Sequence, residues 1–192
     1  MAWSWSQILS SPHERSAEAT RQIALLVGAT LFVALCAHVT IPLMPLTPVP
    51  LTLQNFGVLL VGLLLGSRRG FAAMSLYLIE GASGLPVFNP TGPGGIAQLL
   101  GPTGGFLMAY PLVAFAAGYL YEQRARTFLR AAFAGVVGEI LLFAGGLAWL
   151  YAFTHSFAKA AYLGLYWFLA AETIKVMFAA AIAARWRRSA IE

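Results

Sequence analysis

Long apolar stretches that alternate with short clusters of arginine are the feature that most restricts how this chain can fold. Six such stretches lie at about residues 22–40, 51–66, 70–83, 105–121, 131–153 and 162–184. A bilayer core of about 30 Å needs roughly 20 helical residues, so the second and third stretches are short for a membrane span. The chain is 59% hydrophobic and 10% charged, with a mean hydropathy of +0.75, which is too apolar for a soluble domain of 192 residues. We therefore predict an all-α integral membrane protein, a single membrane domain over residues 1–192 with six transmembrane helices.

The basic residues predict how these helices are oriented. With six spans, the N-terminus, the turn after the second span, the loop after the fourth span and the C-terminus all share one side. Ten of the twelve Lys and Arg residues lie on that side: Arg15, Arg21, Arg68, Arg69, Arg124, Arg126, Arg130, Arg185, Arg187 and Arg188. Basic residues gather on the cytoplasmic side, so we expect both ends there, with residues 1–20 as a cytoplasmic or interfacial segment. This pattern also argues against nucleic acid as the partner of the +5 net charge.

Two irregular segments on the opposite side are candidates for covering a pocket. Residues 41–50 cannot continue a helix because they hold four prolines, namely Pro42, Pro45, Pro48 and Pro50. Residues 84–104 are rich in glycine and proline and also carry apolar side chains. Irregular backbone at membrane depth is tolerated where protein buries it or where it lines a cavity. We expect a packed lid over an outward-facing pocket, with ordinary surface connections as the alternative.

Ionisable residues inside the predicted spans are candidate binding groups, because a charge at the centre of a membrane helix costs at least about 2.5 kcal/mol. Glu172 and Lys175 stand three residues apart, so they share a helical face and can pair. The alternative is a purely structural ion pair. Glu139, near the middle of the fifth span, is either a structural hydrogen-bonding group or a protonated acid. Glu80 lies near the outer end of its span and is less informative.

Several polar and small residues add weaker signals. Gln54 and Asn55 begin the second span under the proline loop, where their amides either face the pocket or cap the helix. The spacings Ala24-x-x-x-Gly28 and Gly62-x-x-x-Gly66 allow close helix approach. The sequence holds neither a phosphate-binding loop nor a zinc or nucleophile motif. We therefore expect no enzyme activity and no cofactor, and energised transport would require partner subunits.

Three motifs stand out together: TPVPLTLQNFGVLLVGLLLGSRRG at residues 47–70, GLPVFNPTGPGGIAQLLGPTGGF at residues 84–106, and ETIK at residues 172–175. In combination they resemble the BioY family, the biotin-binding S components of energy-coupling factor (ECF) transporters. The resemblance implies a six-helix protein of a bacterial or archaeal cytoplasmic membrane that captures biotin from outside. It also implies a transmembrane T component and two ABC ATPase subunits as partners. The alternatives are an S component for another vitamin and a stand-alone small-molecule carrier.

The resemblance also assigns residues. The last helix of the family carries Asp-x-x-Lys in contact with biotin, which falls on Glu172 and Lys175, with Glu in place of Asp. The family's biotin-contacting asparagine after the third helix falls on Asn89, the proline loop matches the family's gate, and Ala24 with Gly28 matches its T-component docking site. Further candidates for the pocket lining are Gln54, Thr103 and Tyr110, with Phe88, Phe168 and Trp167 as apolar walls suited to the bicyclic ring of biotin.

Overall fold

The computed structural model describes residues 12–123 and 125–188, and these residues are almost entirely helical. In chain order the elements are α2 (Pro12–His38), β1 (Thr40–Ile41), β2 (Leu51–Thr52), α3 (Gln54–Leu65), α4 (Ser67–Ala82), α5 (Gly95–Leu100), α6 (Gly104–Glu122), α7 (Phe128–Thr154), α8 (Phe157–Ala161), the π-helix η1 (Tyr162–Tyr166) and α9 (Leu169–Arg188). The predicted all-α class is confirmed, since the only strands in the described part are two of two residues each. Most of the predicted N-terminal segment before α2 lies outside the described residues.

Length and composition identify some of these helices as membrane spans. Among the described residues, three helical segments are long and apolar enough to cross a membrane: Ser16–His38 of α2, α6 and α7. The bent pair formed by α8–η1 and α9 is a fourth when taken as one span. The α3 and α4 helices have 12 and 16 residues, as short as the sequence indicated. Each of the six predicted stretches is mainly helical, but crossing by all six stays a prediction, as does the orientation.

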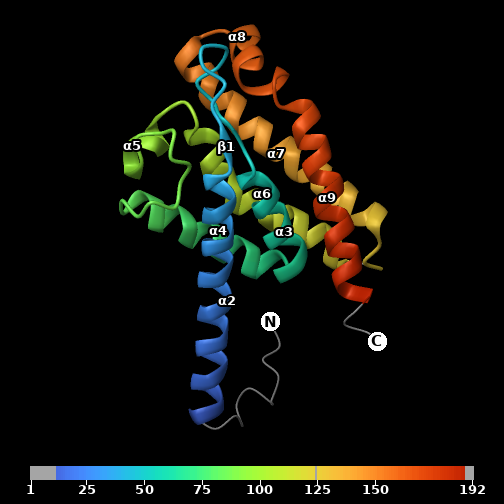
Figure 1. Ribbon diagram of the computed structural model, residues 1–192. Helices are drawn as coiled ribbons and strands as arrows, with labels where there is room; N and C mark the ends of the chain where they lie inside the picture. Colours follow the sequence, from blue (N-terminus) through green and yellow to red (C-terminus); the bar gives the residue numbers. More distant parts are fainter. Residues whose placement is uncertain (1–11, 124, 189–192) are drawn as a thin grey trace.

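The proline-rich segment is not helical, as predicted. It forms a short hairpin. Its ends pair in antiparallel fashion, Thr40 with Thr52 and Ile41 with Leu51. The Met44–Pro45 peptide bond between them is cis. This hairpin lies at the upper end of the molecule beside α8, whereas α2 begins and α9 ends toward the lower end (Figure 1).

The turn between α3 and α4 depends on a glycine. Gly66 has a φ of 86°, which favours glycine, and an added Cβ would overlap the carboxylate of Glu122 from α6. That carboxylate accepts hydrogen bonds from the Ser67 backbone N–H at 3.1 Å and from the Ser67 hydroxyl at 2.9 Å. The first turn of α4 is therefore satisfied by α6 and not by its own N-cap residue, which makes no side-chain cap.

Small residues let α3 approach α6 closely. A Cβ added at Gly62 would lie 2.5 Å from the carbonyl oxygen of Ala114, and one at Gly118 would lie 2.5 Å from the backbone nitrogen of Ser67. The expectation that Gly62 permits close helix packing is therefore confirmed. Gly28 differs, because an added Cβ there would meet nothing within 4 Å.

The last predicted span is interrupted, which corrects the expectation of one continuous helix over residues 162–184. Residues 162–166 form a π-helix, and the chain bends by 46° before α9 begins at Leu169. The hydroxyl of Thr47, in the proline loop, donates a hydrogen bond of 2.6 Å to the carbonyl oxygen of Leu163. A side chain that inserts into the hydrogen-bond ladder is a common cause of a bend, and this contact lies within the irregular turn.

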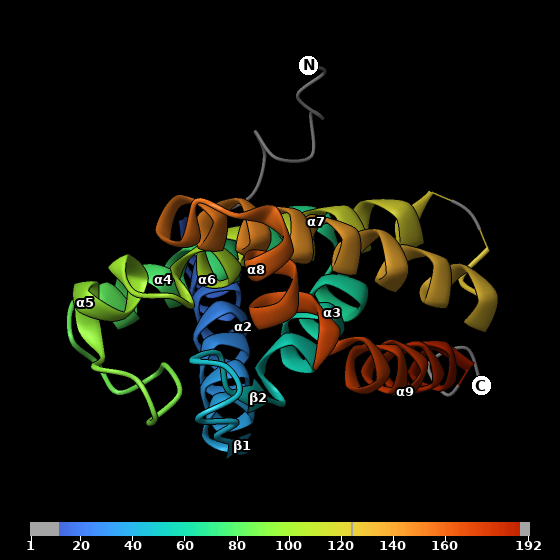
Figure 2. The ribbon, with the colours of Figure 1, turned by 90° about the horizontal axis from the view of Figure 1, so that it is seen from above.

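The arrangement of α7 and α9 leaves the space in which the site lies. Seen from above, α7 and α9 run side by side at one end of the molecule, with α3 beneath them (Figure 2). The loop around α5 lies at the other end, beyond α4 and α6 (Figure 2). The loop over residues 84–104 also differs from its prediction as purely irregular, because α5 forms within it.

Candidate functional site

Four polar side chains from three helices meet in the interior. Asn55 comes from the first turn of α3, Glu139 from the middle of α7, and Glu172 with Lys175 from the first part of α9. Their exposed fractions are 4%, 8%, 6% and 9% respectively. Because burying such groups is costly unless they are paired, each needs a partner. We call these four residues the polar cluster.

The hydrogen bonds within the polar cluster join all four residues. The amide nitrogen of Asn55 donates to Oε1 of Glu139 at 2.5 Å and to Oε2 of Glu172 at 3.0 Å. The ammonium of Lys175 donates to Oε1 of Glu172 at 2.7 Å, so the pairing predicted from the i, i+3 spacing is confirmed. Asn55 thus bridges two carboxylates that are far apart in the chain.

Lys175 also ties α9 to the proline loop. Its ammonium donates a second hydrogen bond, of 2.5 Å, to the backbone carbonyl oxygen of Thr52. Thr52 is the last residue of β2, and only Leu53 separates it from α3. The base of the hairpin and the polar cluster are therefore one connected unit.

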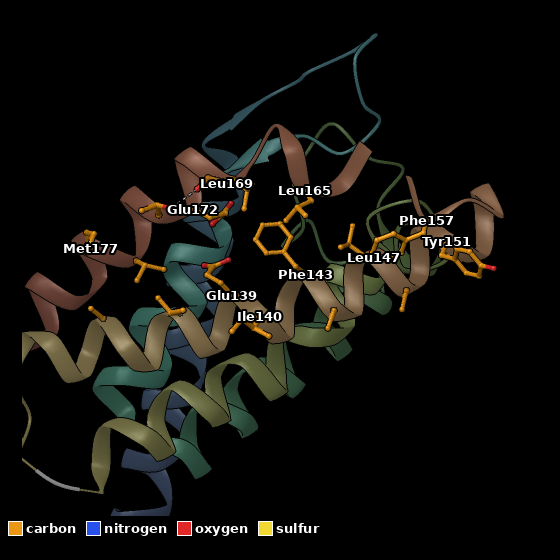
Figure 3. Close-up of a pocket in the computed structure, with 16 residues that line it drawn as sticks. Glu139, Ile140, Phe143, Leu147, Tyr151, Phe157, Leu165, Leu169, Glu172 and Met177 are labelled. Carbon is orange, nitrogen blue, oxygen red and sulfur yellow. Dashed lines mark hydrogen bonds between the residues drawn. The ribbon is translucent and has the colours of Figure 1, made fainter. Parts of the chain in front are cut away.

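An open apolar cavity of about 890 Å³ lies between α7 and α9, and Phe157 of α8 and Leu165 of η1 also line it (Figure 3). The two carboxylates of the polar cluster, from Glu139 and Glu172, are in its wall and point toward one another across the gap. Most other lining residues are apolar, including Ile140, Phe143, Leu147, Leu165, Leu169 and Met177. A large apolar cavity with a few converging polar groups is typical of a small-molecule site.

Two acceptor atoms of the polar cluster have no hydrogen-bond partner. Among the described residues, Oε2 of Glu139 and Oδ1 of Asn55 are buried and unpaired. Buried polar atoms in native structures are nearly always paired with protein, water or a ligand. The cluster therefore has unused hydrogen-bonding capacity for another molecule.

A second polar group lies beneath the loop over residues 84–104. Gln54 donates to the hydroxyl of Tyr77 at 2.8 Å, and Tyr77 donates to the carbonyl oxygen of Val87 at 2.6 Å. Tyr77 also packs edge-on against Phe88, with ring centroids 5.5 Å apart. This group holds the loop against α3 and α4. It contains two predicted site residues, Gln54 and Phe88, and Gln54 adjoins Asn55 of the polar cluster.

The remaining predicted site residues are buried or partly buried near these groups. Asn89 is buried, its side-chain oxygen accepts a hydrogen bond of 2.6 Å from Thr91, and its backbone carbonyl accepts one from Gln98. Tyr110 and Phe168 are buried in the core. Thr103 precedes α6 and makes no side-chain cap. None of these residues is among those lining the cavity between α7 and α9.

The predicted site lacks two residues of the polar cluster, Glu139 and Asn55. The sequence marks Glu139 only as an acid within an apolar helix. For Asn55 it allows both a pocket-facing and a capping role, and in the structure its amide bonds to Glu139 and Glu172. The sequence does contain a signal for this cluster. Glu139, Glu172 and Lys175 are ionisable residues within apolar helices, and such residues need to pair with one another or with other polar groups.

Comparisons with known proteins agree with the sequence motifs. The BioY family model matches residues 9–192. A probable biotin transporter BioY of Pyrococcus horikoshii is 40% identical over 155 residues, covering 81% of this chain and 91% of that protein. The biotin transporter BioY of Thermotoga maritima is 38% identical over 167 residues, covering 87% of this chain and 98% of that protein. A crystal structure of the S component for biotin from an ECF-type ABC transporter matches with a TM-score of 0.80 at 23% identity, over 93% of this chain and 95% of that one.

The fold and the helix lengths together define a helical membrane protein. Its helices match those of a solved S component, and two carboxylates of the polar cluster lie in the wall of the apolar cavity between α7 and α9. The chain belongs to the BioY family, which comprises transporter components and not enzymes.

Proposed function

We propose that this protein binds biotin with high affinity and serves as the substrate-capture subunit of an ECF-type transporter in a bacterial or archaeal cytoplasmic membrane. The observation that carries the proposal is the buried polar cluster, whose Glu139 and Glu172 lie in the wall of a cavity of about 890 Å³. The names of the relatives in Pyrococcus horikoshii and Thermotoga maritima supply biotin as the substrate. Biotin is the transported molecule here and not a cofactor.

The chemistry of biotin suits this cavity. Its fused ring system and valerate chain are largely apolar, and Phe143, Leu147 and Leu165 offer apolar walls. Its ureido group provides two N–H donors and a carbonyl acceptor, which need a small number of buried polar partners. Glu172 and Lys175 supply such groups in our proposal, and Asn89 with Gln54 extends the site under the loop over residues 84–104.

The proline loop acts as the gate in this proposal. Its base is held to α9 by Lys175 and its middle to η1 by Thr47, so opening the loop would break contacts to both. Pro42, Pro45, Pro48 and Pro50 limit the conformations available to the segment. A restricted loop with few anchoring bonds can open without unfolding the helices.

Energy for uptake comes, in this proposal, from a T component and two cytoplasmic ATPases. The arginines at the turn after α3 and the end of α9 support a cytoplasmic location for that side, with both chain ends there. Ala24 and Gly28 line a shallow apolar groove of about 320 Å³ between α2 and α3, together with Leu60, Val61 and Leu64. The open space beside Gly28 supports helix docking by the T component at this groove.

Ligand selectivity tests the proposed function. Calorimetric titration of the detergent-purified protein with biotin, thiamine and riboflavin should give a dissociation constant between nanomolar and low micromolar for biotin alone, without ATP. Comparable affinity for thiamine or riboflavin, or no heat with biotin and no competition by unlabelled biotin, would contradict it.

A further inference from the structure

Glu139 lies in the cavity wall, and only one of its two carboxylate oxygens has a hydrogen-bond partner among the described residues. Its Oε1 accepts the hydrogen bond from Asn55 at 2.5 Å, whereas its Oε2 is buried and without a partner. The side chain is 8% exposed and comes from the middle of α7, and its carboxylate faces α9 across the cavity (Figure 3). A carboxylate that served only to bind Asn55 would leave a costly unsatisfied oxygen.

The amide orientation of Asn55 determines what kind of group is missing. Its nitrogen lies within hydrogen-bond distance of two carboxylate oxygens, from Glu139 and Glu172. The reverse orientation would set the amide oxygen against both carboxylates, so nitrogen must face them. The two unpaired atoms of the polar cluster are Oδ1 of Asn55, which is an acceptor, and Oε2 of Glu139, which is an acceptor when this side chain is ionised. With Glu139 ionised, the missing group is a donor.

With Glu139 ionised, the charges of the polar cluster disfavour an anionic group at this point. The cluster contains two carboxylates and one ammonium, and the bonds of Lys175 are directed to Glu172 and Thr52 and not to Glu139. A ligand carboxylate beside Glu139 would face a like charge in surroundings that screen it poorly. A neutral group with N–H donors would instead satisfy the vacant acceptor.

We infer that Glu139 is a specificity-determining residue whose Oε2 accepts a hydrogen bond from a ureido N–H of the ligand. The inference rests on the proposed function, since it takes biotin as the ligand. It sets the orientation of the substrate: the ureido ring faces the polar cluster between α7 and α9, and the valerate carboxylate lies away from Glu139.

The test combines Glu139→Gln with altered ligands. Glutamine retains the size and one oxygen to accept from Asn55, but presents N–H in place of the free oxygen. We expect the dissociation constant for biotin to rise at least tenfold. Two cyclic carbamate analogues of biotin, each with a ring oxygen in place of one ureido N–H, complete a double-mutant-type cycle. The unaltered protein should bind one of these carbamates at least tenfold more weakly than biotin. For that carbamate, the substitution Glu139→Gln should weaken binding by less than a further threefold.

Glu80→Gln is the matched control. Glu80 is also an intramembrane glutamate with one side-chain hydrogen bond, from the Thr30 hydroxyl at 3.1 Å, and it joins α4 to α2 outside the cavity. The biotin affinity of Glu80→Gln should stay within threefold of that of the unaltered protein. Affinities are measured by competition against radiolabelled biotin, with analogue concentrations up to the millimolar range. This range allows a loss of affinity of about a thousandfold to be measured.

The outcomes separate this inference from the proposed function. Two outcomes would overturn the inference alone. One is a biotin affinity of Glu139→Gln within threefold of the unaltered protein. The other is that Glu139→Gln weakens the binding of biotin and of both carbamates by the same factor. Should Glu139→Gln not fold, binding of both carbamates by the unaltered protein within threefold of biotin would also overturn it. Absence of biotin binding by the unaltered protein would contradict the proposed function, and the inference with it.

Discussion

At the scale of single residues, the pairing of buried charges explains how α9 tolerates two ionisable side chains. Lys175 and Glu172 are 9% and 6% exposed, and Nζ of Lys175 lies 2.7 Å from Oε1 of Glu172. Such a pair contributes little net stability compared with apolar residues of the same size, but removing one partner leaves the other charged and buried. Stability alone therefore does not explain the pair, which agrees with the binding role proposed for it.

A pair of variants separates these effects. Lys175→Ala should destabilise the biotin-free protein by about 3 kcal/mol because it isolates Glu172. The double variant Lys175→Met with Glu172→Leu should recover most of this loss while remaining unable to bind biotin with normal affinity. Thermal unfolding in detergent, followed by tryptophan fluorescence, measures the first quantity and titration the second. A double variant as unstable as Lys175→Ala would show that the charge is not the cause.

At the scale of helices and loops, the small residues have two different roles. A Cβ at Gly62 would meet the α6 backbone at 2.5 Å, whereas one at Gly28 would meet nothing within 4 Å. Gly62 therefore fixes the distance between α3 and α6, and Gly28 keeps a surface groove open.

The same substitution at both glycines tests this difference. Gly62→Ala should lower the thermal midpoint in detergent, with a cost of about 1–3 kcal/mol from overpacking. Gly28→Ala should be neutral or slightly stabilising, because alanine favours helix by up to about 1 kcal/mol. Equal midpoints for the two variants would contradict the packing described for α3 and α6.

The proline loop provides a second prediction at this scale. Thr47→Val removes the hydroxyl that donates to Leu163 and should speed biotin dissociation several-fold by freeing the loop from η1. Thr40→Val is the matched control, because the Thr40 hydroxyl is buried and has no hydrogen-bond partner among the described residues. Stopped-flow displacement of labelled biotin measures both rates. An unchanged rate for Thr47→Val would show that this hydrogen bond does not restrain the loop.

At the scale of the whole molecule, the cavity and the Gly28 groove lie on different helix pairs. The cavity is lined from α7, α8, η1 and α9, and the groove from α2 and α3. Substrate capture and partner docking should therefore be separable by substitution.

Gly28→Leu should abolish biotin uptake by cells that express the T component and ATPases, while purified protein binds biotin with unchanged affinity. The bulky side chain fills the groove without reaching the cavity. Ala19→Leu, at an exposed position of α2 outside the groove, should leave uptake unchanged. Normal uptake by Gly28→Leu would exclude this groove as the docking surface.

Much of the architecture could be predicted from the sequence because it follows from local chemistry. Four prolines exclude a helix over residues 41–50, and the i, i+3 spacing of Glu172 and Lys175 allows them to pair on one helix face. The bend before Leu169 and the bridge from Asn55 to Glu139 depend on contacts between residues 84 or more positions apart. No local pattern encodes such contacts, so the site appeared in the sequence as separate ionisable residues.

The most direct test of the central claim, that the polar cluster beside the cavity is the biotin site, is the biotin affinity of Lys175→Ala. We expect a loss of at least tenfold, or about 1.4 kcal/mol, relative to the unaltered protein. Lys159→Ala, which removes an exposed lysine of α8, should bind biotin normally. Unchanged affinity in folded Lys175→Ala protein would contradict the claim and place the site elsewhere.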